Sequence, residues 1–204
     1  MNAAPTIEGR LVRLRHVRED DLEAIRHIRS DRDVREAILA SPTPETPEQQ
    51  RSWFEHLPTN ADQLIFVIAA ERDDRVLGVI GLYNISRHHG HAEWGFYLGA
   101  HGLRNGGAAV EAELLLLDHA FGVEGLHRIY CRVLSTRPRT VSMHQRFGFA
   151  VEGMMPAHAA TRRGFEDVIF MGIDAARYSK NRAAVAAVIQ RLFGSSAQRG
   201  AEPR

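Results

Sequence analysis

The residues best suited to chemistry form a short glycine-rich run, Arg104-Asn105-Gly106-Gly107-Ala108-Ala109, between an expected strand and a long expected helix. Small side chains let the backbone approach a ligand closely, and unpaired N–H groups at a helix N-terminus bind phosphate oxygens. The run therefore predicts a pyrophosphate site. The alternative is an ordinary glycine-rich loop before a helix. The run has neither the P-loop nor the GxGxxG spacing.

A second candidate is the histidine-rich stretch His88-His89-Gly90-His91. Histidines at close spacing can bind a transition metal, but no cysteine or carboxylate partner follows at a fixed spacing. We interpret the stretch as a hairpin turn and expect no metal. We assign Trp53 and Trp94 to the core or a pocket wall, because no basic and aromatic surface pattern surrounds them.

Composition limits the function classes. The 204 residues include 26 Lys and Arg against 25 Asp and Glu, a net charge of +1 that favours neither nucleic acid nor an anionic membrane. Cys131 is the only cysteine, so an intrachain disulfide is excluded. No apolar run is long enough for a signal peptide or a membrane span. We therefore expect a cytoplasmic protein with one domain.

The first half of the chain predicts a strand, two helices and an antiparallel meander. Residues 11–15 alternate as a strand does, and acidic Glu19-Asp20-Asp21 begins a helix. Thr46-Pro47-Glu48-Gln49 is a capping box with proline at the first helical position, which begins the second helix. The three strands of the meander are expected at residues 64–71, 76–85 and 92–98.

The second half predicts a long helix at residues 108–121 and then a strand at 128–134, which implies a parallel crossover. A short helix beginning at Pro138 ends before Gly148. Two more strands, 150–154 and 168–173, are joined by a loop around 158–164, and a terminal helix follows. We expect one domain over residues 1–193 and a flexible tail over 194–204.

Five segments resemble the GNAT acetyltransferases in order and spacing. They are Ala92-Glu93-Trp94-Gly95-Phe96-Tyr97-Leu98, Arg104-x-x-Gly107-x-Ala109 with Glu111-Ala112, Leu126-His127-Arg128-Ile129, Arg146-Phe147-Gly148-Phe149, and Glu152-Gly153. Within this superfamily the chain resembles the branch that holds ribosomal-protein N-terminal acetyltransferases. Residues 127–153, with His144 and Phe165-Glu166-Asp167-Val168, are more similar to the aminosugar N-acetyltransferases of the pseudaminic acid pathway.

The resemblance implies an α/β fold of the α+β kind, with a mixed and mostly antiparallel sheet flanked by helices. Its sheet splays between the fourth and fifth strands, where acetyl-CoA binds without a metal. On this mapping the backbone of Phe96, Tyr97 and Leu98 holds the pantetheine arm. The residues that hold the pyrophosphate on this mapping are Arg104, Asn105, Gly106, Gly107, Ala108 and Ala109.

One cofactor contact departs from the family pattern. Relatives place an asparagine after the fifth strand, whereas this chain has Arg137, which cannot accept a hydrogen bond. Either Arg137 reaches a phosphate, or the cofactor is held more loosely.

The resemblance also implies two catalytic candidates. His144 occupies the position where many relatives carry a tyrosine that protonates the departing thiolate, and an imidazolium could do the same. Glu93 could take the proton of the amine, directly or through a water. The alternatives are a packed or solvated helix histidine and a strand carboxylate that orients the acceptor or pairs with an arginine.

The acceptor is expected to be an aminosugar or its nucleotide derivative. Family geometry places it between the first two helices and the loop near Arg162 and Arg163, and these segments are basic enough to favour an anionic acceptor over a polyamine. A solvated arginine surface is the alternative. Other functions left open are acetylation of a protein N-terminal amine and a non-catalytic acyl-CoA-binding module. Residues 183–192 could pack on the sheet or form a homodimer contact.

Overall fold

The computed structural model describes residues 6–39, 46–104 and 107–193. The strands are β1 (Ile7–Glu8), β2 (Val12–Arg15), β3 (Leu64–Ala70), β4 (Val76–Ser86), β5 (His91–Leu98), β6 (Arg128–Leu134), β7 (Ala150–Thr161) and β8 (Gly164–Asp174). They form one sheet in the order β1-β2-β3-β4-β5-β6-β8-β7. Every neighbouring pair is antiparallel except β5 and β6, which are parallel. The expected mixed and mostly antiparallel sheet is confirmed.

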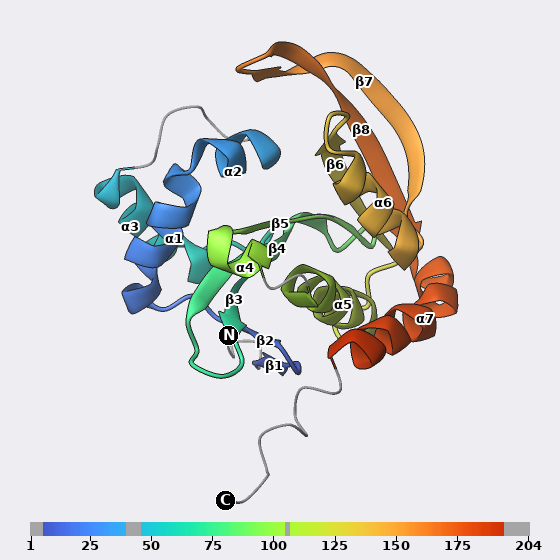
Figure 1. Ribbon diagram of the computed structural model, residues 1–204, viewed down its shortest axis with the longest axis horizontal. Helices are drawn as coiled ribbons and strands as arrows, with labels where there is room; N and C mark the ends of the chain where they lie inside the picture. Colours follow the sequence, from blue (N-terminus) through green and yellow to red (C-terminus); the bar gives the residue numbers. More distant parts are fainter. Residues whose placement is uncertain (1–5, 40–45, 105–106, 194–204) are drawn as a thin grey trace, which may run out of the picture.

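Helices cover both faces of this sheet (Figure 1). They are α1 (Leu22–Ser30), α2 (Arg32–Ala37), α3 (Pro47–His56), α4 (Ala100–Arg104), α5 (Gly107–Gly122), α6 (Pro138–Phe147) and α7 (Ala175–Phe193), with short 3-10 turns η1 (Glu19–Asp21) and η2 (Leu57–Thr59). The larger core cluster packs α5 and α7 against one face, and the smaller cluster packs α1 and its neighbours against the other. None of the described helices is long and apolar enough to cross a membrane.

Local sequence signals fix two helices where they were expected. The Thr46 hydroxyl accepts a hydrogen bond from the Gln49 amide at 3.2 Å, and the Gln49 side chain accepts one from the Thr46 amide at 2.9 Å, so α3 begins at the capping box. Pro138 begins α6, and Gly148 ends it at φ +106°, a conformation that favours glycine.

The connection between the last two strands differs from the expected loop. β7 and β8 form a long hairpin whose turn is only Arg162-Arg163, so most of residues 158–164 belong to the strands. Gly164, at φ +110°, takes the left-handed position that such a tight turn needs. The sequence did not indicate the outer parts of the strands because residues 156–161 are small, polar or exposed and lack a buried face.

Three other short elements, β1, α2 and α4, were not expected from the sequence. Because β1 precedes the first expected strand, the fourth and fifth expected strands are β5 and β6 here. The expected terminal helix is confirmed as α7. The tail predicted for residues 194–204 lies outside the described residues.

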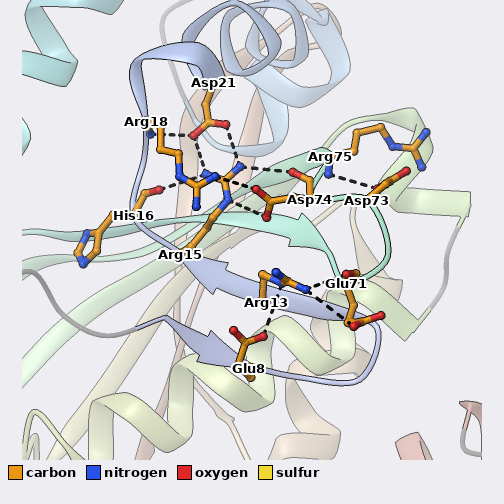
Figure 2. A network of polar contacts seen from close by, with 10 residues as sticks. All are labelled: Glu8, Arg13, Arg15, His16, Arg18, Asp21, Glu71, Asp73, Asp74 and Arg75. Carbon is orange, nitrogen blue, oxygen red and sulfur yellow. Dashed lines mark hydrogen bonds and ion pairs between the residues drawn. The ribbon is translucent and has the colours of Figure 1, made fainter.

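A buried arginine joins the first helical turns to the sheet (Figure 2). Arg15 is 3% exposed, and its guanidinium donates to both carboxylate oxygens of Asp21, at 2.7 and 2.9 Å. It also donates to Asp74 at 3.0 Å, in the turn between β3 and β4. Burial works to raise the pKa of Asp74, but Arg15 and Arg18 outweigh it and hold that pKa below its ordinary value. The Asp74 contribution to stability is therefore present above about pH 4 and lost in stronger acid.

We expect Arg15→Ala to lower the free energy of unfolding by about 3 to 5 kcal/mol, because it leaves the buried Asp21 carboxylate unpaired. Arg18→Ala is the matched control. Its side chain also pairs with Asp74 but is 61% exposed, so its loss should stay below about 1 kcal/mol. Denaturant unfolding at neutral pH measures both. Equal losses would show that the buried pair does not anchor the first helices.

Candidate active site

The sheet divides between β5 and β6. These strands pair at only three positions, the last being Glu93 opposite Tyr130. Beyond that point β5 stays paired with β4 as far as Leu98, while β6 stays paired with β8 as far as Leu134. Within the described ranges, the final part of β5 therefore has no ladder partner on its β6 side, and the expected splay is confirmed.

The open edge of β5 includes Phe96, Tyr97 and Leu98, the residues predicted to hold the pantetheine arm. Such an edge offers backbone N–H and C=O groups to an extended ligand, as it would to an added strand. Leu98 is buried in the larger core cluster and Tyr97 in the smaller one, while half-buried Phe96 packs against the larger. The side chains anchor the strand in both cores, so its backbone can serve a ligand.

The predicted phosphate-binding run lies just beyond β5. Gly107 and Ala108 are buried and Ala109 is half-buried in the first turn of α5. Arg104 is the last residue of α4, and Asn105 and Gly106 lie outside the described residues. A Cβ atom at Gly102 would lie 3.0 Å from Leu98 Cδ2, so glycine there lets α4 pack closely on the end of β5. The predicted cofactor residues that the structure describes are thus brought to one end of the sheet.

His144 lies on α6, on the same face of the sheet as Trp94. The residue is 3% exposed, and its ring meets the Trp94 ring edge-on, with centroids 5.0 Å apart. The ring centroid of Phe149 lies 5.6 Å away. Its Nδ1 is 3.0 Å from Oε1 of Glu113 on α5. His144 is therefore a packed histidine with a carboxylate partner.

Glu93 lies on the opposite face of β5. Its carboxylate accepts a hydrogen bond from Arg132 Nε at 2.7 Å and another from Asn84 Nδ2 at 3.1 Å. Two of its roughly four lone-pair positions are thus used. Nearby, burial raises the pKa of the Tyr83 hydroxyl to about 12, with an additional contribution from Glu93, so Tyr83 stays neutral at physiological pH.

The two predicted catalytic residues, His144 and Glu93, lie on opposite faces of the sheet. Trp94, beside His144, belongs to the core cluster under α5, whereas Glu93 is one position earlier on β5 and points to the other side. Glu93 lies at the last paired position of β5 and β6, and Trp94, which His144 contacts, is the next residue of β5.

Arg137 follows β6 and precedes the first residue of α6. Its guanidinium Nη2 is 3.5 Å from the backbone carbonyl oxygen of Asp33 on α2, across the opening. The side chain thus connects the start of α6 to α2.

The tip of the β7–β8 hairpin also reaches α2. In Figure 1 the hairpin curves as an arch from β6 toward α2. Arg162 Nη2 is 2.6 Å from Asp33 Oδ1, and the Arg162 amide donates to Glu36 at 3.1 Å. Arg162 is therefore engaged by two acidic residues, which weakens the expectation that it is available to an anionic acceptor. Arg163, its neighbour in the turn, is exposed.

The histidine-rich stretch is a turn, as expected. It connects β4 to β5, with Gly90 at φ +66°. The rings of His88 and His89 meet edge-on, 4.7 Å apart. In the ranges that the structure describes, no three His, Cys, Asp or Glu side chains gather as metal ligands would.

Comparison with known proteins decides the family. Residues 11–150 match the family model described as an acetyltransferase (GNAT) domain. The chain belongs to the GNAT acetyltransferases. It is accordingly an N-acetyltransferase that uses acetyl-CoA.

Individual relatives of this GNAT chain are distant. It is 24% identical over 165 residues to the spermidine N(1)-acetyltransferase of Vibrio cholerae, covering 81% of this chain and 94% of the relative. The spermidine N(1)-acetyltransferase of Escherichia coli K12 is 23% identical over 142 residues, covering 70% and 74%.

Solved structures share the fold. The spermidine N-acetyltransferase from Vibrio cholerae, in complex with CoA and spermine, superposes with a TM-score of 0.78 at 22% identity, covering 83% of this chain and 98% of that one. A GCN5-related N-acetyltransferase from Brucella melitensis gives a TM-score of 0.77 at 24% identity, covering 96% and 90%.

Sequence reasoning missed the partners of the predicted residues. Glu113, Arg132 and Asp33 each come from an element distant in the sequence from the residue they contact. Only Glu113 left a signal, since a carboxylate in the apolar run of α5 is unusual for a helix that is largely buried.

We expect Arg162→Ala to speed amide hydrogen exchange in the outer part of the β7–β8 hairpin, by roughly five-fold. A surface ion pair contributes up to about 1 kcal/mol, and the hairpin tip has no other ion pair to α2 among the described residues. Arg163→Ala is the matched control and should leave exchange unchanged. Equal exchange in both variants would show that the position of the β7–β8 hairpin does not depend on the ion pairs of Arg162 with Asp33 and Glu36.

Proposed function

We propose that this GNAT enzyme transfers acetyl directly from acetyl-CoA to a primary amine at the open end of the β5–β6 pairing. The observation that carries the proposal is the divergence of the two strands after Glu93, with a histidine under one face and a carboxylate on the other. This arrangement separates the leaving-group side from the amine side of a single reaction centre.

In this proposal the backbone of Phe96, Tyr97 and Leu98 holds the pantetheine arm. The start of α5 at Gly107, Ala108 and Ala109, with Arg104, Asn105 and Gly106 before it, holds the pyrophosphate. Arg137, at the mouth of the opening, is long enough to exchange its weak contact with Asp33 for a phosphate oxygen. The group bound there supplies an acetyl thioester.

Two side chains handle the protons of the transfer. The neutral amine forms a bond to the acetyl carbon as the carbon–sulfur bond breaks, so the nitrogen must lose a proton and the sulfur must gain one. His144 gives its Nε2 proton to the sulfur. Glu93 receives the amine proton, directly or through a water, while Arg132 and Asn84 hold its carboxylate in place.

For the acceptor we propose an aminosugar or a nucleotide-linked aminosugar. The carboxylates around the opening already have cationic partners: Glu93 has Arg132, and Asp33 and Glu36 share Arg162. A polyamine carries several positive charges and would have to displace these arginines. An aminosugar carries one ammonium group among neutral hydroxyls and would not. Exposed Arg163 in the hairpin turn remains suited to a diphosphate.

A polyamine is the second candidate acceptor. Two of the similar proteins are spermidine N(1)-acetyltransferases, and Asp33 is 62% exposed at the mouth of the site. If Arg162 moved aside, Asp33 and Glu36 would become the acidic lining that a polyamine needs. The two candidates therefore differ in the role they require of Arg162.

We expect Arg104→Glu to weaken acetyl-CoA binding at least ten-fold in calorimetric titration, because a carboxylate beside the pyrophosphate repels it. Arg72→Glu, on the exposed turn between β3 and β4, introduces the same charge away from the site and should bind as the wild type does. Equal binding by both variants would place the pyrophosphate elsewhere.

The acceptor is tested with a panel of amines, with thiol release from acetyl-CoA as the readout. We expect a nucleotide-linked aminosugar to give a kcat/KM at least ten-fold above that of spermidine, and Arg163→Ala to raise its KM. The reverse order, with spermidine turnover increased in Arg162→Ala, would establish the polyamine instead.

A further inference from the structure

Glu113 is a completely buried carboxylate in the middle of α5. Its side chain is 0% exposed, and its two oxygens lie 3.0 and 3.2 Å from Nδ1 of His144 on α6. The two residues are 31 positions apart in the sequence. The fold thus brings a carboxylate to the inner nitrogen of the histidine proposed as the acid.

Burying a carboxylate costs several kcal/mol unless hydrogen bonds or an opposite charge compensate it. Glu111, two residues earlier on the same helix, shows how hydrogen bonds compensate a buried carboxylate. Its side chain accepts hydrogen bonds from the backbone amides of Arg10, Leu11 and Val12 at 2.6 to 3.0 Å. Among the contacts of the described residues, Glu113 has only His144. Glu111 therefore anchors the chain before β2, and Glu113 has no comparable anchoring contact.

The other titratable groups near Glu113 cannot supply a positive charge. Cys131 on β6 and Tyr178 on α7 are the groups that face it from neighbouring elements, and burial raises the pKa of both, so they remain neutral. Asp118 and Arg182 pair with each other beyond Tyr178. Among the described residues, His144 is thus the group next to Glu113 that can balance the carboxylate charge.

We propose that Glu113 is a positioning residue that holds the Nδ1–H of His144, so that Nε2 faces away from α5 and carries the proton given to the leaving sulfur. The inference rests on the proposed function, because it concerns the histidine assigned there as the acid. Nδ1 and Nε2 are separated by Cε1 in a rigid planar ring and point in different directions, so the Glu113 contact at Nδ1 fixes the direction of Nε2. Trp94 and Phe149 restrict the ring further.

His144 and Glu113 share one proton between Nδ1 and the carboxylate, here called the inner proton. The proton balance of the transfer is the same whether the inner proton lies on Nδ1 or on Glu113. Burial raises the pKa of Glu113, and the His144 charge opposes that rise. With the inner proton on Nδ1, the pair is a carboxylate and an imidazolium; with it on Glu113, the pair is neutral and Nε2 still carries a hydrogen. In the transfer the Nε2–H bond breaks and the S–H bond forms. If the inner proton was on Glu113, it moves to Nδ1, and solvent then restores the proton on Nε2.

The test compares Glu113→Gln, which keeps the shape and removes the charge, with His144→Ala and with the double variant. We expect kcat of Glu113→Gln to fall roughly 10- to 100-fold, with the Kd for acetyl-CoA within about three-fold of the wild type. The double variant should be no slower than His144→Ala alone, because the two residues act as one unit. Thiol release from acetyl-CoA with the best acceptor of the amine panel measures kcat.

Glu111→Gln is the matched control, since it removes a buried carboxylate from the same helix. It should lower the unfolding midpoint and leave kcat unchanged. If Glu113→Gln fails to fold, Glu113→Leu takes its place, because an apolar side chain removes the buried charge without leaving a polar group unpaired.

A second readout does not depend on activity. In NMR of nitrogen-15 histidine-labelled protein, with the His144 signals assigned from His144→Ala, the Nδ1–H hydrogen bonded to the Glu113 carboxylate should give a downfield proton resonance. This resonance should move upfield or disappear in Glu113→Gln, because an amide is a weaker acceptor than a carboxylate. An unchanged resonance together with wild-type kcat would overturn the positioning role.

The outcomes separate this inference from the proposed function. Loss of kcat in His144→Ala but not in Glu113→Gln would overturn the role of Glu113 and leave the acid assignment intact. Wild-type kcat in His144→Ala would overturn both. Loss of acetyl-CoA binding in Glu113→Gln, with the fold retained, would show that Glu113 shapes the cofactor site and does not position the acid.

Discussion

The early end of the pairing between β5 and β6 is the constraint on which the site depends. Two parallel strands that stayed paired would satisfy each other's backbone groups and close the sheet. Here each strand is held by a different neighbour, β5 by β4 and β6 by β8, so they can diverge after Glu93 without losing their ladders on the other side. The cores on both faces hold this separation, with Tyr97 packed in one and Leu98 in the other. The open backbone edge is therefore a stable feature of the fold.

Charges near the opening are organised in pairs that cross between elements. Arg132 on β6 holds Glu93 on β5, Arg162 of the hairpin holds Asp33 and Glu36 on α2, and Glu113 on α5 contacts His144 on α6. The first two join the walls of the opening above the sheet, and the third lies in the core below it. A nearly neutral chain can thus have a strongly polar site. The same pairing explains why counting arginines along the sequence overstates how many are available to an acceptor.

Much of the fold could be predicted because its signals are local. The capping box at Thr46, the glycine after α6 and the alternation in β6 each depend on a few adjacent residues. The splay and the cofactor run came from five segments in a fixed order, and the structure confirms the splay. The long β7–β8 hairpin could not be predicted, because most of its outer residues lack a buried face and therefore any periodic pattern. The partners Glu113 and Asp33 could not be predicted either, since only the folded chain brings α5 to α6 and the hairpin tip to α2.

Amide hydrogen exchange with and without saturating acetyl-CoA tests most directly whether the divergence of β5 and β6 creates the cofactor site. If the open edge of β5 holds the pantetheine arm, amides of residues 95–98 and of the first turn of α5 should exchange more slowly in the complex, while exchange in the outer part of β7 should not change. Protection that appears without any change in β5, for example only in the groove between α1 and α3 lined by Glu23, Arg26 and Glu48, would contradict the claim that the divergence of β5 and β6 creates the cofactor site.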